Sequence, residues 1–282
     1  MSAAGDLLLV AEAAAREAGA LLVEGQQGTV RVTQTKSSPT DIVTAVDVAS
    51  EELIRSTILA SRSSDGFVGE EGDDIHGSSG VVWIADPIDG TVNYLYGIPA
   101  FSVSIAASFE GVVVAGVVHN PMSGETFTAA LGEGARLDGR PISVGACTDI
   151  GQALVGTGYS YLADVRARQA VETAQLVSVV RDIRRIGSAA LDLCYVACGR
   201  YDAYVERALK RWDLAAGRLI VTEAGGRVEG LNGDEPGELI VTAAAPQLYD
   251  AFHAALLAAG FGDWPLPDWP EPPTSRSRPA PA

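Results

Sequence analysis

The sequence predicts an α/β protein whose first half is α+β. Two apolar runs, 101–109 and 112–118, flank a Glu-Gly pair at 110–111, which is typical of a β-hairpin. After position 153, short apolar runs alternate with segments of helical periodicity, which indicates an α/β layer. We therefore expect a mostly antiparallel sheet in the first half and strands alternating with helices in the second.

Length and composition set the domain organisation that we expect. The chain has 282 residues, of which 47% are hydrophobic, so it is long enough for one large domain or two closely joined ones. We expect an N-terminal α+β part at 1–150 and a C-terminal α/β part at 151–262. The last stretch, 263–282, is rich in Pro and Ser and predicts a flexible tail without a catalytic role.

The charge balance excludes several kinds of partner. The formal net charge is −16, from 36 acidic and 20 basic residues, which disfavours direct binding to nucleic acid or to an anionic membrane. It leaves room for a small phosphate substrate, because bound cations reverse the local field. The N-terminus lacks a basic leader region, and no apolar stretch reaches about 18 residues, the length that a membrane span needs. We therefore expect a cytoplasmic protein.

The first half begins with two helices and several strands. Helical spacing of apolar residues predicts helices at 7–23 and 45–60, and a polar loop at 36–41 follows an extended segment at 29–35. Further strands are expected at 67–71, 81–86, 126–130 and 135–137. Thr44 and Asp47 fit a capping box at the start of the second helix, which is one interpretation of Asp47.

The second half alternates strands with helices. We expect strands at 153–157, 183–186, 201–206 and 238–242, and helices at 165–180, 187–198, 213–223 and 246–259. The three cysteines and three histidines have no ligand spacing that completes a zinc site. We expect Cys147, Cys194 and Cys198 to be buried, reduced thiols.

The stretch 83–93 combines a strand end with the ligands that a hard cation prefers. Asp86 and Asp89 stand where the apolar strand ends, separated by Pro87 and Ile88. Gly90 allows a sharp turn and leaves the next amides accessible to a phosphate. An ordinary Asp-Pro-Gly turn is the alternative interpretation of these residues.

Four acidic residues lie at element boundaries: Glu70, Asp86, Asp89 and Asp213. Together they form an oxygen-only set that can hold two or three Mg²⁺ ions. Two such ions can orient a water and stabilise the leaving oxygen in phosphoryl transfer. Each residue also has a simpler explanation, and that of Asp213 is the N-cap of a helix.

Five motifs, in order, resemble the inositol monophosphatase family over about 7–260. They are the Lys-Ser-Ser-Pro-Thr-Asp string at 36–41, Thr-Ala-Val-Asp at 44–47, Gly-Glu-Glu at 69–71, the Asp-Pro-x-Asp-Gly-Thr-x-Asn signature at 86–93, and Trp-Asp at 212–213 followed by Glu-Ala-Gly-Gly at 223–226. The resemblance implies an alternating α/β/α/β/α layered sandwich with a mixed second sheet. It also implies a Mg²⁺-dependent, lithium-sensitive phosphatase that is commonly homodimeric.

The resemblance implies a role for each matching residue. The first Mg²⁺ would bind Glu70, Asp86 and the carbonyl of Ile88, and the second would bind Asp86, Asp89 and Asp213. Glu70 would also help to hold a third ion. Thr91 and Asp47 would orient and deprotonate the attacking water, and the amides of Gly90 and Thr91 would bind the phosphate. Lys36 would lie in a mobile loop that closes near the metals.

Substrate choice is expected at a second group of residues. Glu206 matches the family's carboxylate for polyol hydroxyls, with Gly187, Ser188 and Ala189 lining the same pocket; a strand-end surface acid is the alternative for Glu206. Arg207, Lys210 and Arg211 form a basic cluster that could favour a substrate with extra negative charge, or simply a solvated cationic face. Tyr159 stands where a small polar residue often occurs, which leaves the shape of the pocket open.

The leading hypothesis is therefore a phosphatase that hydrolyses inositol monophosphates. Related activities remain alternatives: fructose-1,6-bisphosphatase, histidinol-phosphatase and nucleotide 3′-phosphatase. A regulatory partner of the transcription machinery is an alternative of a different class, since some family members have that role.

Overall fold

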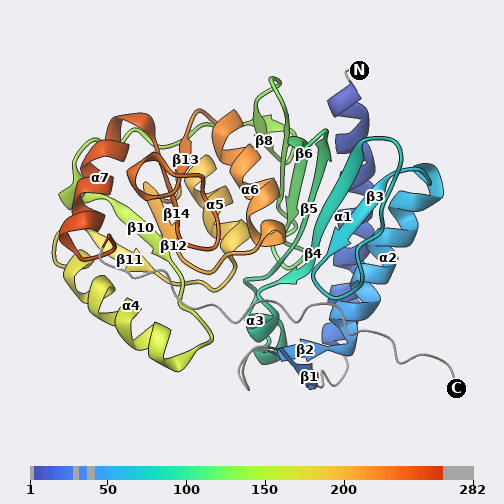
Figure 1. Cartoon of the computed structure of the whole chain (residues 1–282), viewed down its shortest axis with the longest axis horizontal. Coiled ribbons are helices and arrows are strands. Elements are labelled where there is room, and N and C mark those ends of the chain that lie inside the picture. Colours follow the sequence, from blue (N-terminus) through green and yellow to red (C-terminus); the bar gives the residue numbers. More distant parts are fainter. Residues whose placement is uncertain (1–2, 28–31, 37–41, 263–282) are drawn as a thin grey trace, which may run out of the picture.

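The structure is a computed structural model that describes residues 3–27, 32–36 and 42–262. Helices and sheets alternate in five layers (Figure 1). Helices α1 (Ala3–Gln26) and α2 (Ala45–Ser61) cover the outer face of a seven-stranded sheet, and α5 (Ala189–Ala197) and α6 (Arg211–Glu223) lie between this sheet and a five-stranded one. Helices α4 (Ala163–Leu176) and α7 (Pro246–Ala258) cover the far face. The expected α/β/α/β/α sandwich is confirmed.

The seven-stranded sheet is antiparallel except at one edge. Its order is β3-β4-β5-β6-β7-β8-β9, and only β3 and β4 run parallel. The strands are β3 (Gly66–Gly69), β4 (Val81–Asp89), β5 (Ser102–Phe109), β6 (Val112–His119), β7 (Thr126–Ala130), β8 (Ala135–Leu137) and β9 (Arg140–Pro141). The predicted hairpin is β5–β6, and its turn residues Glu110 and Gly111 both have positive φ.

The five-stranded sheet is mixed, in the order β11-β10-β12-β14-β13. The strands are β10 (Leu154–Thr157), β11 (Asp182–Arg184), β12 (Ala203–Glu206), β13 (Arg227–Glu229) and β14 (Val241–Ala244). Several predictions needed correction. The helix expected at 165–180 ends at Leu176, and the strand expected at 238–242 begins only at Val241. The short strand β13 was not predicted, because three residues carry too little alternation.

A two-stranded hairpin, β1 (Val32–Thr35) and β2 (Ile42–Thr44), lies beside the short helix α3 (Thr91–Tyr96) at one end of the molecule (Figure 1). The rest of the predicted loop after Lys36 and the predicted tail at 263–282 lie outside the described residues. The division of the chain near position 150 stays a prediction.

Side chains that alternate along the strands build the core on both faces of each sheet. In β4, Trp83 packs with the α1–α2 layer, whereas the next residue, Ile84, packs with α5 and α6. In β12, Tyr204 faces the central helices and Val205 faces the α4–α7 layer. Burying each of these side chains contributes about 2 kcal/mol of stability. The two central helices, α5 and α6, thus pack against an apolar face of each sheet.

The described helices include none that is long and apolar enough to cross a bilayer. The three cysteines form no disulfide. Cys194 is buried as expected, but Cys147 and Cys198 are only partly buried.

Candidate active site

Strand β4 carries both aspartates of the central motif. It runs to Asp89, three residues beyond the predicted end, because pairing with β5 resumes after an irregularity. Asp86 lies opposite Ser104 and Asp89 opposite Ser102, and Pro87 lies in the irregular part between them. Proline is tolerated there because no ladder hydrogen bond is needed from its nitrogen. The two carboxylates are therefore held by sheet register, not by a free turn.

Gly90 turns the chain sharply from β4 into α3. Its φ is +103°, in the region that favours glycine. A Cβ atom at this position would lie 3.1 Å from both the Ala100 and Gly187 carbonyl oxygens. The predicted sharp turn is confirmed, but the helix that follows it was not predicted. This turn brings the start of α3 to the edge of the sheet where Asp86 and Asp89 lie.

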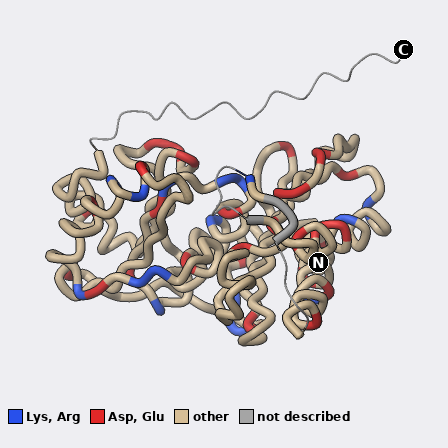
Figure 2. Tube along the Cα trace, turned by 90° about the horizontal axis from the view of Figure 1, so that it is seen from below, with Lys and Arg blue, Asp and Glu red and all other residues tan. Residues whose placement is uncertain are grey.

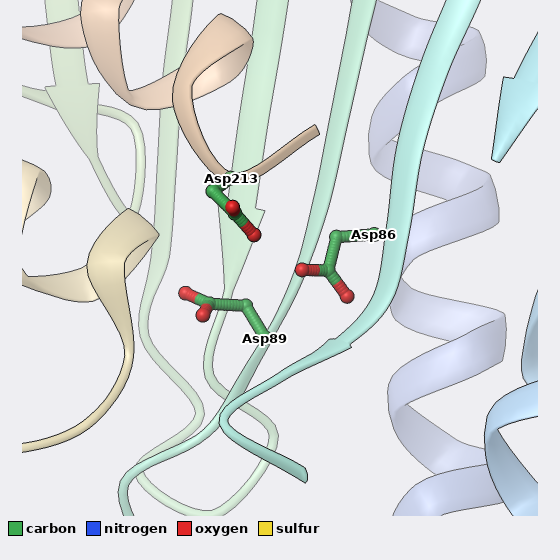
Figure 3. A group of neighbouring side chains, drawn as sticks. All are labelled: Asp86, Asp89 and Asp213. Carbon is green, nitrogen blue, oxygen red and sulfur yellow. The ribbon is translucent and has the colours of Figure 1, made fainter. Parts of the chain in front are cut away.

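Asp213 reaches the same place from the first turn of α6 (Figure 3). Each of the three aspartates has a carboxylate oxygen that lies within 4.8 Å of the corresponding oxygens of the other two. Asp86 is 1% exposed and Asp89 is 7% exposed. One oxygen of Asp213 accepts the backbone N–H of Lys210 at 2.7 Å, so Asp213 caps α6 from its third position; the N-cap residue is Lys210, not Asp213 as the sequence suggested. Three carboxylates from two distant segments thus form one acidic cluster, in which Asp86 and Asp89 are buried and Asp213 is partly buried.

Two serines of β5 connect this cluster to the central helices. Ser104 Oγ donates to the carbonyl of Trp212 at 3.2 Å, next to Asp213. Ser102 Oγ lies 3.3 Å from Ser188 Oγ at the start of α5. These two serines were not predicted as site residues, although polar side chains alternate within the otherwise apolar start of β5. That alternation was the available signal.

The acidic cluster holds several carboxylates whose pKa values are raised. Burial, followed by the nearby charge of Glu70, raises the pKa of Asp86 and of Asp213 well above the usual range. Burial raises the pKa of Asp89 to about 6, although Ser188 and the amides of Ala190 and Ala189 lower it. Buried like charges of this kind are stabilised by a bound cation.

Asp47 and Thr91 lie against the cluster and contact each other. Thr91 Oγ1 is 3.1 Å from Asp47 Oδ1 and 3.1 Å from the carbonyl oxygen of Ile88. Asp47 Oδ2 accepts the backbone N–H of Thr44 at 2.8 Å and its hydroxyl at 2.6 Å. The capping box is therefore confirmed, and the other carboxylate oxygen is turned toward Thr91.

Glu70 and Lys36 form the border of the site. Lys36 Nζ donates to Glu70 Oε1 and Glu71 Oε1, each at 2.7 Å. Although burial lowers the pKa of Lys36, the two carboxylates raise it overall. Burial also raises the pKa of Glu71 to about 7. Lys36 thus contacts Glu70, which is a predicted metal ligand.

Asp89 holds the N-terminus of α5. It accepts Ser188 Oγ at 2.6 Å, the Ala189 amide at 3.2 Å and the Ala190 amide at 2.7 Å. The residues expected to line the substrate pocket are thus brought beside the acidic cluster. Ser188 and Ala189 contact it through Asp89, and Gly187 precedes them with φ +91°.

Glu206 lies at the end of β12, partly buried. Its Oε2 accepts the hydroxyl of Tyr204. Its carboxylate lies where a Cβ on Gly158 would otherwise be, which explains the absence of a side chain there. Burial raises the pKa of Glu206 to about 7, while Tyr204 and Arg185 lower it and Asp89 raises it. This electrostatic coupling to Asp89 indicates that Glu206 lies near the cluster.

Arg207 does not belong to the basic cluster suggested by the sequence, whereas Lys210 and Arg211 are exposed. Arg207 is only 8% exposed and donates to Glu172, 3.4 Å away, and to the carbonyls of Leu239 and Phe261. It is a buried structural residue, so both interpretations made from the sequence were wrong for Arg207. Lys210 is exposed and pairs with Glu238 at 3.0 Å.

Comparisons with known proteins identify the family. The pattern of the inositol monophosphatase family matches residues 5–259. A protein of Mycobacterium leprae named inositol-1-monophosphatase is 48% identical over 232 residues, covering 78% of this chain and 80% of that protein. A Pasteurella multocida protein named Nus factor SuhB is 40% identical, covering 86% and 92%.

The solved structures agree. The crystal structure of the extragenic suppressor protein suhB from Bartonella henselae has a TM-score of 0.84 and 36% identity, and the match covers 89% of this chain and 98% of that one. The chain therefore belongs to the inositol monophosphatase family and is an enzyme. The predicted resemblance and fold are confirmed.

Proposed function

We propose that this enzyme is a Mg²⁺-dependent phosphatase that hydrolyses inositol monophosphates to inositol and phosphate. The observation that carries the proposal is the convergence of Asp86, Asp89 and Asp213 within 4.8 Å. An oxygen-only donor set with raised carboxylate pKa values suits a hard divalent cation. The names of the M. leprae and other relatives support the substrate.

The residues that would hold the ions come from three segments. They are Glu70, Asp86, the carbonyl of Ile88, Asp89 and Asp213. The Ile88 carbonyl oxygen lies 3.1 Å from Thr91 Oγ1, so it lies beside the site. When bound, Mg²⁺ supplies positive charge that neutralises the phosphate and lowers the pKa of a water.

Asp47 and Thr91 are arranged to move a proton. A hydroxyl has one proton and two lone pairs. With its proton donated to Asp47, the Thr91 oxygen can accept a hydrogen bond from a water molecule. Proton transfer through Thr91 to Asp47 would then leave a hydroxide aimed at phosphorus, and Glu70 would help to hold the ions beside it. This is our proposal for the catalytic use of the three residues.

Phosphate and polyol would bind on either side of the Gly90 turn. The amides of Gly90 and Thr91 begin α3 and suit the phosphate oxygens. Glu206 would accept hydrogen bonds from ring hydroxyls next to Gly187. Ser188 and Ala189 would act on the substrate indirectly, because both hold Asp89.

A panel of phosphate esters tests this function. Phosphate release would be measured from myo-inositol 1-phosphate, fructose 1,6-bisphosphate, histidinol phosphate and adenosine 3′,5′-bisphosphate, with Mg²⁺, with EDTA and with Li⁺. We expect release that depends on Mg²⁺, is inhibited by Li⁺ and is fastest on the inositol ester. Faster turnover of another ester would change the substrate, and release in EDTA would contradict the metal.

A regulatory role with the transcription machinery is a second candidate, supported by the relatives named Nus factor SuhB. Direct contact with nucleic acid is not part of this candidate, because the net charge is −16 and basic residues are interspersed with acidic ones along the described trace (Figure 2). Co-purification of RNA polymerase with both the unaltered chain and Asp89→Asn would support the role. Absence of the polymerase from both preparations would argue against the role.

We also propose that the protein forms a homodimer, which analytical sedimentation would test.

A further inference from the structure

Arg185 lies beside the proposed substrate pocket, in the loop between β11 and α5. Its side chain is exposed. A Cβ atom on Gly187 would lie 2.6 Å from Arg185 Nη1 and 3.1 Å from Asn93 Nδ2. The Gly187 carbonyl in turn lies 3.1 Å from the Cβ position of Gly90. The guanidinium is therefore close to the turn proposed to bind phosphate.

The backbone beneath Arg185 is held in place. Asn93 Nδ2 donates to the carbonyls of Ile186, at 2.7 Å, and Ala100, at 2.6 Å. Ser188 is bonded to Asp89. These hydrogen bonds connect the loop to α3 and to the start of α5. The backbone from which the exposed Arg185 side chain extends is therefore fixed.

Arg185 faces a group of carboxylates. It lowers the pKa of both Glu206 and Asp192, whereas Asp89 raises the pKa of both. Asp192 is 1% exposed and lies in the first turn of α5. The guanidinium thus lies near two acids, Glu206 and Asp192, and a second phosphate of a substrate would approach both of them at a cost.

The neighbouring Arg184 provides a contrast. Its guanidinium pairs with Asp182 at 2.6 Å, and both side chains are about half exposed, at 46% and 51%. Arg184, the last residue of β11, and Arg185, the first residue of the loop, thus have different surroundings: Arg184 is in a surface ion pair, and Arg185 is beside Gly187 and Glu206.

We propose that Arg185 and Glu206 form a donor–acceptor pair that binds neighbouring hydroxyls of the substrate, which makes Arg185 a specificity-determining residue. A guanidinium donates from a planar fork and a carboxylate accepts, so together they match adjacent hydroxyls, which both accept and donate. This inference rests on the proposed function and identifies the polyhydroxylated part of the substrate as its target.

Steady-state kinetics of Arg185→Gln, with Arg184→Gln as the matched control, test the proposal. Substrates would be myo-inositol 1-phosphate, fructose 1,6-bisphosphate and phenyl phosphate, which has no hydroxyls. Loss of hydrogen bonds to a charged donor predicts that Arg185→Gln raises KM for the inositol ester about tenfold with little change in kcat. KM for phenyl phosphate should change less than about twofold, and Arg184→Gln should change neither.

Three results would overturn the inference. An equal rise in KM for all substrates would mean that Arg185 has a structural role. An unchanged KM for every substrate would mean that Arg185 does not contact the substrate. A rise in KM for the bisphosphate alone would show that Arg185 binds a second phosphate. Arg185→Lys, which keeps the charge but loses the fork, should restore the KM only in part. If the unaltered chain releases no phosphate from any ester, the proposed function fails first and the inference with it.

Discussion

The hydroxyl of Thr91 donates a hydrogen bond to Oδ1 of Asp47 over 3.1 Å, while Oδ2 of the same carboxylate caps α2 through Thr44. The first turn of one helix is thereby linked to the turn that follows β4. The two interpretations of Asp47 made from the sequence, capping and catalysis, are compatible because the carboxylate has two oxygens.

Asp47→Asn tests the proposed proton acceptor. We expect kcat to fall about 100-fold or more, because an amide cannot accept the proton. The free energy of unfolding should fall by only about 1 kcal/mol, since an Asn oxygen still accepts one of the capping hydrogen bonds. Phosphate release and urea unfolding measure the two effects.

Asp149→Asn is the control for that experiment. Asp149 caps a short 3₁₀ turn, η1 (Ile150–Gln152), by accepting the Gly151 amide at 2.9 Å. This variant should keep full activity. A similar loss of activity in both variants would mean that the effect comes from weakened caps, not from lost proton transfer.

Asp213→Asn tests the metal site without the α5 contacts that Asp89 makes. Mg²⁺ should raise the melting temperature of the unaltered chain, because a ligand that binds only the folded state stabilises it. The variant should bind Mg²⁺ about tenfold or more weakly, as judged by the Mg²⁺ concentration that produces half of this rise. Asp250→Asn, an exposed acid on α7, should behave like the unaltered chain. An unchanged Mg²⁺ response in Asp213→Asn would contradict its assignment as a ligand.

Asp65→Asn tests a buried contact that supports β4. Asp65 accepts Arg62 Nε at 2.8 Å, Ser79 Oγ at 2.6 Å and the Trp83 indole N–H at 2.9 Å. The variant should lose about 2 kcal/mol of unfolding free energy at pH 7 in urea titrations. Asp182→Asn, which breaks an exposed ion pair, should leave the melting temperature unchanged.

The same contact has a pH signature. Burial alone would raise the pKa of Asp65, but the hydrogen bonds from Arg62, Ser79 and Trp83 lower it overall. A lowered carboxyl pKa contributes stability that is present at neutral pH and is lost as pH falls below about 4. The stability difference between the unaltered chain and Asp65→Asn should therefore shrink as pH falls from 7 to 3. A constant difference would mean that the carboxylate charge contributes nothing.

Glu206 predicts a pH dependence of substrate binding. Burial raises the pKa of Glu206 to about 7. The ionised carboxylate, which would accept hydrogen bonds from substrate hydroxyls, is therefore lost as pH falls below that value. As pH falls from 8 to 6, KM for myo-inositol 1-phosphate should rise more than KM for phenyl phosphate. The phenyl phosphate profile corrects for titration of the phosphate group. Glu206→Gln should remove the difference between the two profiles. Parallel profiles for the unaltered chain would mean that Glu206 does not bind the polyol.

Local sequence was enough to predict one side of the site. The spacing of Asp86 and Asp89 lies within a single strand and turn, and the capping box of Thr44 and Asp47 lies within one helical turn. Such features depend on contacts a few residues apart, so they can be inferred from residue types. The longer helices, the β5–β6 hairpin and the mostly antiparallel first sheet were predicted from apolar periodicity for the same reason.

The sequence by itself thus determined the alternation of elements, the oxygen-only chemistry of the site and the resemblance to its family. Only the tertiary structure decided which side chains meet. Packing α5 and α6 between two sheets brings Asp213 to Asp86, lets Asp89 cap α5, and buries Arg207 against Glu172. These contacts join segments up to about 130 residues apart. They follow from the burial of apolar faces across the whole molecule, which no local pattern of residues records.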